Sequence, residues 1–314
     1  MTPDRRLPKS YVCVVLLAAA IQAPAYGWQA APPARPIQVS EDQLMRDVLV
    51  LAADDMQGRL AGTAGGAKAR AYVFQRFKEI GLKPAGASFE QTFKFSGRGE
   101  PGDRSGTNLL AVIPGTRTPD RYIVVTAHYD HIGIRNGQVY NGADDNASGV
   151  AALLAIAEHF KKNPTGPSLL LAALDAEESG LHGARALLNS GPIPKTAMVL
   201  NINVDMIGRD AKNVLYAAGT YHYPALKPML EGVAQPPVEL RLGHDVPNIK
   251  AEDWTKDSDH YPFHEAGIPF IYFGVEDFEN HHKPTDDAET IQQPFFAGAV
   301  KTIIAALEKF GQAR

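Results

Sequence analysis

Histidine and carboxylate side chains gather at five places in this sequence, and at four of them they follow an apolar run. In "SLLLAALDAEESG", the acidic residues Asp175, Glu177 and Glu178 come immediately after seven mostly apolar residues. A buried carboxylate is costly unless it is paired with a positive group or binds a cation. The five places are His128-Tyr129-Asp130-His131, "NGADDNASG" (141–149), Asp175 to Glu178, Asp205, and His281-His282. We therefore expect these side chains to share a cation site.

The residue types indicate which cation the site binds. One histidine with two carboxylates suits Zn²⁺, and two ions bridged by a carboxylate, about 3.5–4 Å apart, serve many hydrolases. Ca²⁺ prefers oxygen ligands alone, so the histidines argue against it. Mn²⁺ and Co²⁺ accept the same ligands and stay open as alternatives. The predicted chemistry is hydrolysis by a water molecule that metal ions activate.

Short apolar runs that alternate with helical patterns must position these residues. We expect strands at 108–113, 122–127, 168–174, 198–204 and 268–273, and helices at about 147–162, 181–190, 224–233 and 294–309. Two earlier helices are predicted, one opened by a capping box at Ser40 and Gln43, and one from about Gly65 to Ile80, closed by Gly81. This alternation predicts a single α/β domain, a mostly parallel mixed sheet with helices on both faces. In such sheets, sites form beyond the carboxyl ends of the strands.

The first 27 residues are typical of a secretory signal peptide. Arg5, Arg6 and Lys9 precede the apolar stretch "YVCVVLLAAAI", and small residues follow in "APAYG". The apolar stretch is too short for a membrane span, which takes about 20 residues. We expect 1–27 to be removed, 28–39 to be a linker and 40–314 to be the catalytic domain of a periplasmic or secreted protein. The cleavage point and the export route stay open.

The composition of the chain limits the classes of partner that the protein is expected to bind. The chain has 314 residues, 45% of them hydrophobic, and a net charge of −4. A nucleic-acid-binding protein usually has a basic surface, and this mild acidity gives no support for one. The only cysteine is Cys13, inside the predicted signal peptide, so the mature chain would hold together by its core without disulfides. No feature of the sequence indicates the oligomeric state.

Six motifs occur in the order found in a known enzyme family. They are "HYD", "GADDNASG", "DAEESGLHGA", "NVDMIG", "SDHYPFHEAGIP" and "HHKPTDD", and the stretch from Gly58 to Leu82 also fits. With these motifs the chain resembles the co-catalytic zinc aminopeptidases of metallopeptidase family twenty-eight, from about Asp54 to Phe310. The resemblance implies the phosphorylase/hydrolase-like fold of zinc peptidases, two Zn²⁺ per chain, and a peptide substrate with a free N-terminus.

The resemblance also implies roles for individual residues. The implied zinc ligands are His128, Asp145, Glu178, Asp205 and His282. Asp145 would bridge the two ions, with His128 and Asp205 on one ion and Glu178 and His282 on the other. Glu177 would be the general base, which takes a proton from water and passes it to the departing amine. Asp130 would orient His128.

Neighbouring residues have less certain roles. His281 stays open as the alternative to His282. Asp144 is expected to help cap the following helix, and His131 and His260 to support the site or the fold. The resemblance further implies a cis peptide bond between Asp145 and Asn146.

One position departs from the family. The family's aminopeptidases have an oxyanion-binding tyrosine three residues before the Ser-Asp-His motif, and Thr255 stands there in this chain. Tyr261, Tyr272, a backbone amide or zinc alone could take over that role. Two alternative functions also stay open: a glutaminyl cyclase of the same fold, and a binding ectodomain without catalysis. A carboxypeptidase acting on acidic peptides is a weaker alternative.

Overall fold

The structure is a computed structural model that describes residues 37–96, 103–247 and 253–312. Residues 37–314 form one compact unit. The predicted signal peptide and all but the last three residues of the predicted linker lie outside the described residues. None of the described helices is long and apolar enough to cross a membrane.

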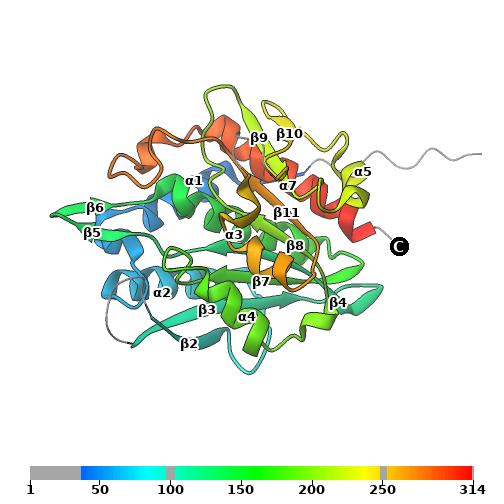
Figure 1. Cartoon of the computed structure of the whole chain (residues 1–314), viewed down its shortest axis with the longest axis horizontal. Coiled ribbons are helices and arrows are strands. Elements are labelled where there is room, and N and C mark those ends of the chain that lie inside the picture. The colour runs from blue at the N-terminus through cyan, green and yellow to red at the C-terminus, as the bar shows by residue number, and fades with distance from the viewer. Residues whose placement is uncertain (1–36, 97–102, 248–252, 313–314) are drawn as a thin grey trace, which may run out of the picture. The chain divides into compact units, whose positions relative to one another are not determined.

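A nine-stranded mixed sheet forms the centre of the described part of the chain (Figure 1). Its order is β1-β3-β7-β4-β8-β11-β9-β10, with β2 paired to β3. The four central strands β7, β4, β8 and β11 are mutually parallel, whereas β3 and β9 join them in antiparallel orientation. The strands are β1 (Lys83–Pro84), β2 (Glu90–Ser96), β3 (Asp103–Ile113), β4 (Thr118–His128), β7 (Pro167–Leu174), β8 (Met198–Val204), β9 (Val214–Ala218), β10 (Glu239–Leu242) and β11 (Phe270–Gly274). A separate hairpin contains β5 (Gly133–Arg135) and β6 (Gln138–Tyr140).

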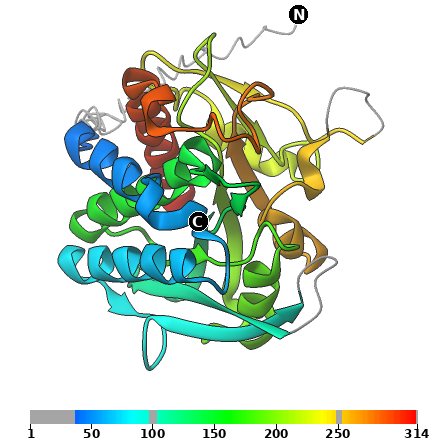
Figure 2. The same cartoon turned by 90° about the vertical axis from the view of Figure 1, so that its left-hand side faces the viewer.

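Helices cover both faces of this sheet, as predicted. The helices are α1 (Glu41–Leu51), α2 (Ala64–Ile80), α3 (Gly149–Lys162), α4 (His182–Ser190), α5 (Lys227–Leu230), α6 (His260–Glu265) and α7 (Gln293–Gln312). Figure 2 shows α1, α2, α3 and α7 on one side of the sheet, with α4 and α6 on the other.

The burial of strand β7 on both faces of the sheet explains why its sequence is almost wholly apolar. Successive side chains of a strand point to opposite faces, and this strand is buried on both. Leu169 and Leu171 belong to the large core with α3 and α7, while Leu170 and Leu174 pack with Leu187 of α4 on the other face. The run can therefore end on carboxylates only where the strand leaves the core.

The ends of two helices follow their sequence signals. The Ser40 side chain accepts a hydrogen bond from the Gln43 amide, which is one half of the expected capping box. The reciprocal half is not formed in the described chain, because the Gln43 side chain bonds Asp47 and Arg46. Helix α2 ends at Gly81, which has a left-handed φ of 75° as a helix C-cap requires.

Candidate metal centre

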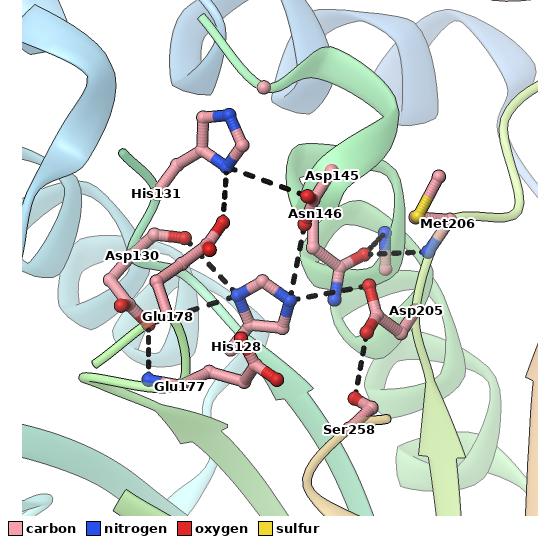
Figure 3. A network of polar contacts seen from close by, with 12 residues as sticks. His128, Asp130, His131, Asp145, Asn146, Glu177, Glu178, Asp205, Met206 and Ser258 are labelled. Atoms are coloured by element: carbon pink, nitrogen blue, oxygen red, sulfur yellow. Dashed lines mark hydrogen bonds and ion pairs between the residues drawn. The ribbon is translucent and has the colours of Figure 1, made fainter. Parts of the chain in front are cut away.

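The side chains singled out by the sequence meet at the carboxyl edge of the central strands (Figure 3). His128 is the last residue of β4, and Asp205 directly follows β8. Glu177 and Glu178 follow β7 after a two-residue turn. Asp145 comes from a short helical segment, η2 (Ala143–Ser148), that leads into α3. Parallel strands end at the same edge, so residues far apart in the sequence become neighbours.

His128, Asp145 and Asp205 form one group of potential metal ligands. His128 Nε2 lies 3.2 Å from Asp205 Oδ1 and 3.4 Å from Asp145 Oδ1. All three side chains are buried. One imidazole nitrogen and two carboxylate oxygens at this spacing are a donor set that suits Zn²⁺.

A second group of potential ligands uses the other oxygen of Asp145. His282 Nε2 lies 3.3 Å from Asp145 Oδ2 and 3.1 Å from Glu178 Oε2. His281 Nε2 lies 3.6 Å from the same Asp145 oxygen, and no contact between His281 and Glu178 is found among the described residues. The two oxygens of Asp145 thus face the two groups, as expected of a bridging ligand. Asp145, His281 and His282 together have metal-ligand spacing, and of the two histidines His282 is the one that faces both Asp145 and Glu178.

His131 lies closer to this second group than the sequence indicated. Its Nδ1 atom is 2.7 Å from Glu178 Oε1 and 3.7 Å from Asp145 Oδ2. Together with these two carboxylates it forms a third set with metal-ligand spacing. His131 therefore belongs to the centre as a support of Glu178 or as a further ligand.

Unsatisfied polar atoms in the centre match the demands of a bound cation. Within the described residues, His131 Nε2 and both carboxylate oxygens of Asp259 are buried without a hydrogen-bond partner, and Glu178 Oε1 has only its ion pair with His131 Nδ1. Buried polar atoms are nearly always paired in folded proteins, so each exception needs a reason. Several carboxylates and imidazoles facing one space would be satisfied by metal ions, and the residues present fit a pair of zinc ions.

The charges in the centre change the proton affinities of its side chains. Burial lowers the pKa of His128, but the carboxylates of Asp205 and Glu177 outweigh it, and the net pKa lies well above the usual value. Burial raises the pKa of Glu178, but the nearby His131 and His282 bring it well below the usual range. The imidazoles thus partly neutralise the carboxylates, as a bound cation would.

Glu177 differs from its neighbour Glu178 in its contacts. Its backbone amide donates to Asp130 Oδ1 at 3.0 Å, and its side chain lines a pocket. Desolvation raises the pKa of the Glu177 carboxyl well above its usual value, and repulsion from Glu178 adds to the rise despite the attraction of His128. A carboxyl group that is not needed as a ligand and whose proton affinity is raised suits proton transfer.

Asp130 is buried beside both His128 and Glu177. His128 Nδ1 lies 3.2 Å from the Asp130 main-chain oxygen and 3.8 Å from its Oδ1. The carboxylate itself accepts the Glu177 amide. Asp130 therefore contacts the His128 ring mainly through its backbone, and it connects that ring to the turn that carries Glu177.

Two residues that the sequence did not single out fix Asp205 in place. Ser258 Oγ donates to Asp205 Oδ2 at 2.7 Å, and Asn203 Nδ2 donates to Ser258 Oγ at 2.8 Å. Because Oδ2 is occupied in this way, Oδ1 is the oxygen that faces His128. Hydrogen bonds of this kind orient metal ligands.

Asp144 is structural, but the expectation that it caps α3 is wrong. Its Oδ1 accepts from the Gly208 amide at 2.6 Å and from Ser148 Oγ at 3.2 Å. Asn146 Oδ1 accepts from the Gly149 amide at the start of α3 instead. The peptide bond between Asp145 and Asn146 is cis, as the resemblance implied.

Arg59 is the largest fully buried side chain near the centre, and no role for it was expected from the sequence. It ends the short helical segment η1 (Asp54–Arg59), and its guanidinium donates to the carbonyls of Leu51, Tyr129, Asn141 and Gly142 at 2.5–2.8 Å. Burial lowers its pKa to about 10, so it stays charged at neutral pH. Arg59 thus connects α1 with the turns that carry Asp130 and Asp145.

Arg209 and Asp286 anchor the loop that carries His282. Asp286 accepts from the amides of Asp144 and Asp145 at 2.9 and 3.0 Å, and Arg209 lies 2.9 Å from Asp286 Oδ1. Arg209 also pairs with Asp277 earlier in the same loop. These contacts fix the loop after β11 against the Asp145 turn.

A pocket of about 480 Å³ opens onto the centre. His128, Asp145, Glu177, Glu178, Asp205 and His282 line one part of it. Apolar, acidic and basic side chains line the rest, among them Leu181, Trp254, Tyr272, Phe278, Asp253, Asp257 and Lys256. Thr255 is buried outside this set, and its hydroxyl donates to Asp253 Oδ1 at 2.5 Å and lies 2.9 Å from His222 Nε2.

The chain is similar in sequence or in fold to several known proteins. The aminopeptidase YwaD of Bacillus subtilis is 29% identical over 200 residues, which cover 59% of this chain and 40% of that protein. A zinc aminopeptidase structure from B. subtilis has a TM-score of 0.68 at 17% identity and covers 89% of this chain and 98% of its own. A glutaminyl cyclase structure from Porphyromonas gingivalis has a TM-score of 0.70 at 19% identity, covering 87% and 99%. These two structures show the fold alone.

The chain spans less than half the length of the first curated relatives it matches. The model of peptidase family M28 matches residues 108–307, which include every predicted metal ligand and both glutamates of the DAEES stretch. The chain therefore belongs to peptidase family M28.

Proposed function

We propose that this protein is a metallo-aminopeptidase that binds two Zn²⁺ per chain and removes N-terminal residues from peptides. The observation that carries the proposal is the position of Asp145. One of its oxygens faces His128 in the group with Asp205, and the other faces His282 in the group with Glu178. A shared carboxylate between two donor sets is the arrangement that a pair of co-catalytic ions requires.

Different groups of the centre have different roles in the proposed hydrolysis. Bound zinc would polarise the scissile carbonyl and make a water molecule acidic. Glu177 accepts the proton of the attacking water as the new carbon–oxygen bond forms. It then delivers this proton to the amine nitrogen as the carbon–nitrogen bond breaks, so that peptide and water become a carboxylic acid and an amine. Asp130 holds the turn of Glu177 through the amide hydrogen bond.

The pocket supports cleavage at a free N-terminus. A positively charged α-amine would be attracted by the carboxylates of Asp253 and Asp257, which line the pocket beyond the ligands. The pocket volume of about 480 Å³ is in the range of small-molecule sites, which fits the end of a peptide. We further propose a secreted or periplasmic location, supported by the N-terminal sequence pattern.

A panel of aminoacyl-nitroanilides tests the proposal directly. We expect hydrolysis with Zn²⁺, loss of hydrolysis after chelation, and recovery when Zn²⁺ is restored. N-acetylated versions of the same substrates are the matched control and should resist cleavage. Full activity in metal-free protein, or equal cleavage of the blocked substrates, would contradict the proposal.

The fold resembles that of a glutaminyl cyclase, so the same experiment should also test this second candidate function. A peptide that begins with glutamine distinguishes the two reactions by their products. Release of free glutamine supports the aminopeptidase, whereas release of ammonia and a cyclised N-terminus supports the cyclase. Zinc binding without either product would support a binding ectodomain.

A further inference from the structure

Tyr272 lies on β11 and extends toward the same edge of the sheet as the metal ligands. Its hydroxyl lies 2.9 Å from where a Cβ would stand on Gly274, two residues further along the strand. Residues two apart share one face of a strand, so the phenol ring lies along the strand and its hydroxyl reaches the strand's carboxyl end. There Tyr272 lines the pocket together with His128, Glu177 and Asp205.

Neighbouring rings hold the Tyr272 side chain in place. The His260 ring stacks on it with centroids 4.6 Å apart and an interplanar angle of 14°. Trp254 packs against it with centroids 5.7 Å apart. Tyr272 is only 6% exposed, and its hydroxyl has no hydrogen-bond partner among the described residues. A fixed hydroxyl that makes no hydrogen bond within the described structure has its donor available for a ligand in the pocket.

The phenol is protonated at neutral pH. The ordinary pKa of tyrosine is about 10. Burial raises the pKa of the Tyr272 phenol well above that value. The hydroxyl can therefore act as a hydrogen-bond donor throughout the neutral range.

The other side chains considered for this role do not enter the pocket. Thr255 is bonded to Asp253 and contacts His222, away from the ligands. Tyr261 lies on α6, its ring 5.8 Å from the Lys256 ammonium, and it is absent from the pocket lining in the described part of the chain. Of these three side chains, Tyr272 is therefore the one that lines the pocket together with the predicted ligands.

We propose that Tyr272 is a catalytic residue that donates a hydrogen bond to the carbonyl oxygen of the scissile bond as that oxygen becomes negatively charged. This inference rests on the proposed hydrolysis, in which the electron pair of the C=O bond moves to oxygen when water attacks. A donor fixed in advance at the position of the developing charge lowers the barrier without reorganisation. Zinc and Tyr272 would then stabilise the same oxyanion from different sides.

Tyr272→Phe tests the inference because it removes only the hydroxyl and keeps the stacked ring. We expect kcat to fall on the order of 10²-fold, as for other single oxyanion donors, with KM and zinc content unchanged. A peptide isostere with a tetrahedral phosphinate in place of the scissile bond should bind more weakly by a similar factor. The free amino-acid product, which has no tetrahedral centre, should bind equally well to both proteins.

Tyr261→Phe is the matched control, and we expect it to keep the wild-type kcat and phosphinate affinity. A wild-type kcat in Tyr272→Phe would overturn the inference and leave the aminopeptidase proposal intact. Loss of zinc from Tyr272→Phe would also overturn it, because the side chain would then act on the fold of the centre. A wild-type protein that cleaves no substrate would instead refute the aminopeptidase proposal itself, together with the inference that rests on it.

Discussion

Glu177 and Glu178 are adjacent in the chain, yet their side chains have different surroundings. The carboxylate of Glu178 lies between His131 and His282, 2.7 and 3.1 Å from their ring nitrogens. Neither histidine contacts the Glu177 carboxylate among the described residues, and this side chain lines the pocket where a substrate would lie. The difference arises because consecutive side chains leave the backbone in different directions, and it separates the proposed base from the proposed ligand.

Replacing each glutamate by glutamine should therefore produce different defects. Glu177→Gln keeps the size of the side chain but cannot accept a proton, so we expect about two zinc ions per chain and a fall in kcat of at least about 10²-fold. Glu178→Gln removes a charged ligand, so one zinc should bind more weakly and excess Zn²⁺ should restore part of the activity. Metal content and kcat are measured side by side. If Glu177→Gln loses zinc and Glu178→Gln keeps it, the two roles are reversed.

The neighbouring histidines give a second comparison at the level of single residues. His282 faces both Asp145 and Glu178, whereas His281 faces only Asp145 in the described structure. We expect His282→Ala to lose about one zinc per chain, and His281→Ala to keep both, because only the former removes a ligand shared with Glu178. The zinc content per chain of the two variants shows which histidine is the ligand. The opposite pattern would make His281 the ligand.

Some residues of the centre could be predicted from the sequence and others could not. Histidine and carboxylate clusters are visible in the sequence and indicated a shared cation site, whereas the resemblance to the aminopeptidase family implied which five residues are the ligands. The roles of Arg59, Ser258 and Asn203 depend on contacts with distant residues, such as the bond from Arg59 to Gly142 across 83 positions. No local pattern marks such a contact. A buried arginine in an otherwise polar segment resembles a surface arginine until the fold is known.

At the level of elements, the central parallel strands were predictable, whereas the buried strand β9 and the edge strands were not. Strand β8 spans the predicted 198–204, and β7 differs from its prediction by one residue. Strand β10, "ELRL", is largely exposed and carries no apolar run. The predicted helix at 224–233 is shorter in the structure, where α5 ends at Leu230. Pro228 and Gly232 explain this, since proline lacks an amide donor and glycine disfavours helix.

Arg59 connects three elements, so its removal should affect the fold as a whole. Arg59→Met would leave the carbonyls of Leu51, Tyr129, Asn141 and Gly142 without this donor. Each unsatisfied buried group costs about 1–3 kcal/mol, so we expect a loss of at least about 3 kcal/mol in the free energy of unfolding. Urea denaturation measures this loss of stability.

Arg185→Met is the control, because Arg185 pairs with Glu265 on the surface and its replacement should change the free energy of unfolding by less than about 1 kcal/mol. Equal effects of the two variants would refute the connecting role of Arg59.

His260 gives the contact between α6 and β11 a dependence on pH. It is fully buried, and burial lowers its pKa to about 3. An unfolded chain has a histidine pKa of about 6.5, so between pH 6.5 and 3 the unfolded state binds more protons than the folded state. Stability should therefore fall as the pH drops through this window, by up to about 1.4 kcal/mol per pH unit from this residue. His260→Phe keeps a stacked ring at this position. In this variant the free energy of unfolding, measured by urea denaturation between about pH 4 and 6.5, should therefore depend less on pH. An unchanged slope would show that His260 is not the group responsible.

At the scale of the whole molecule, the metal centre joins elements from the full length of the described chain. Its residues come from the ends of β4, β7, β8 and β11 and from the start of α3, while Arg59 and Arg209 bind the surrounding turns. The carboxylates of Asp145, Glu178, Asp205 and Asp259 are brought together at one edge of a buried sheet. Folding must therefore work against their mutual repulsion, and a bound cation would offset that cost.

Metal removal should consequently lower the stability of the whole domain as well as its activity. A ligand that binds only the folded state stabilises it by about 2.7 kcal/mol at a free concentration of 100 times Kd. We expect the Tm to fall after chelation, to rise with added Zn²⁺ in a concentration-dependent way, and to respond far less to Mg²⁺, which binds histidine poorly. Differential scanning calorimetry of the same preparation measures all three. Asp145→Asn removes the shared charge between the two groups, so its Tm should respond less to Zn²⁺ than that of the wild type. A Tm that is identical in chelated and zinc-loaded wild-type protein would mean that the carboxylates are satisfied without a cation, and the proposed metal centre would have to be abandoned.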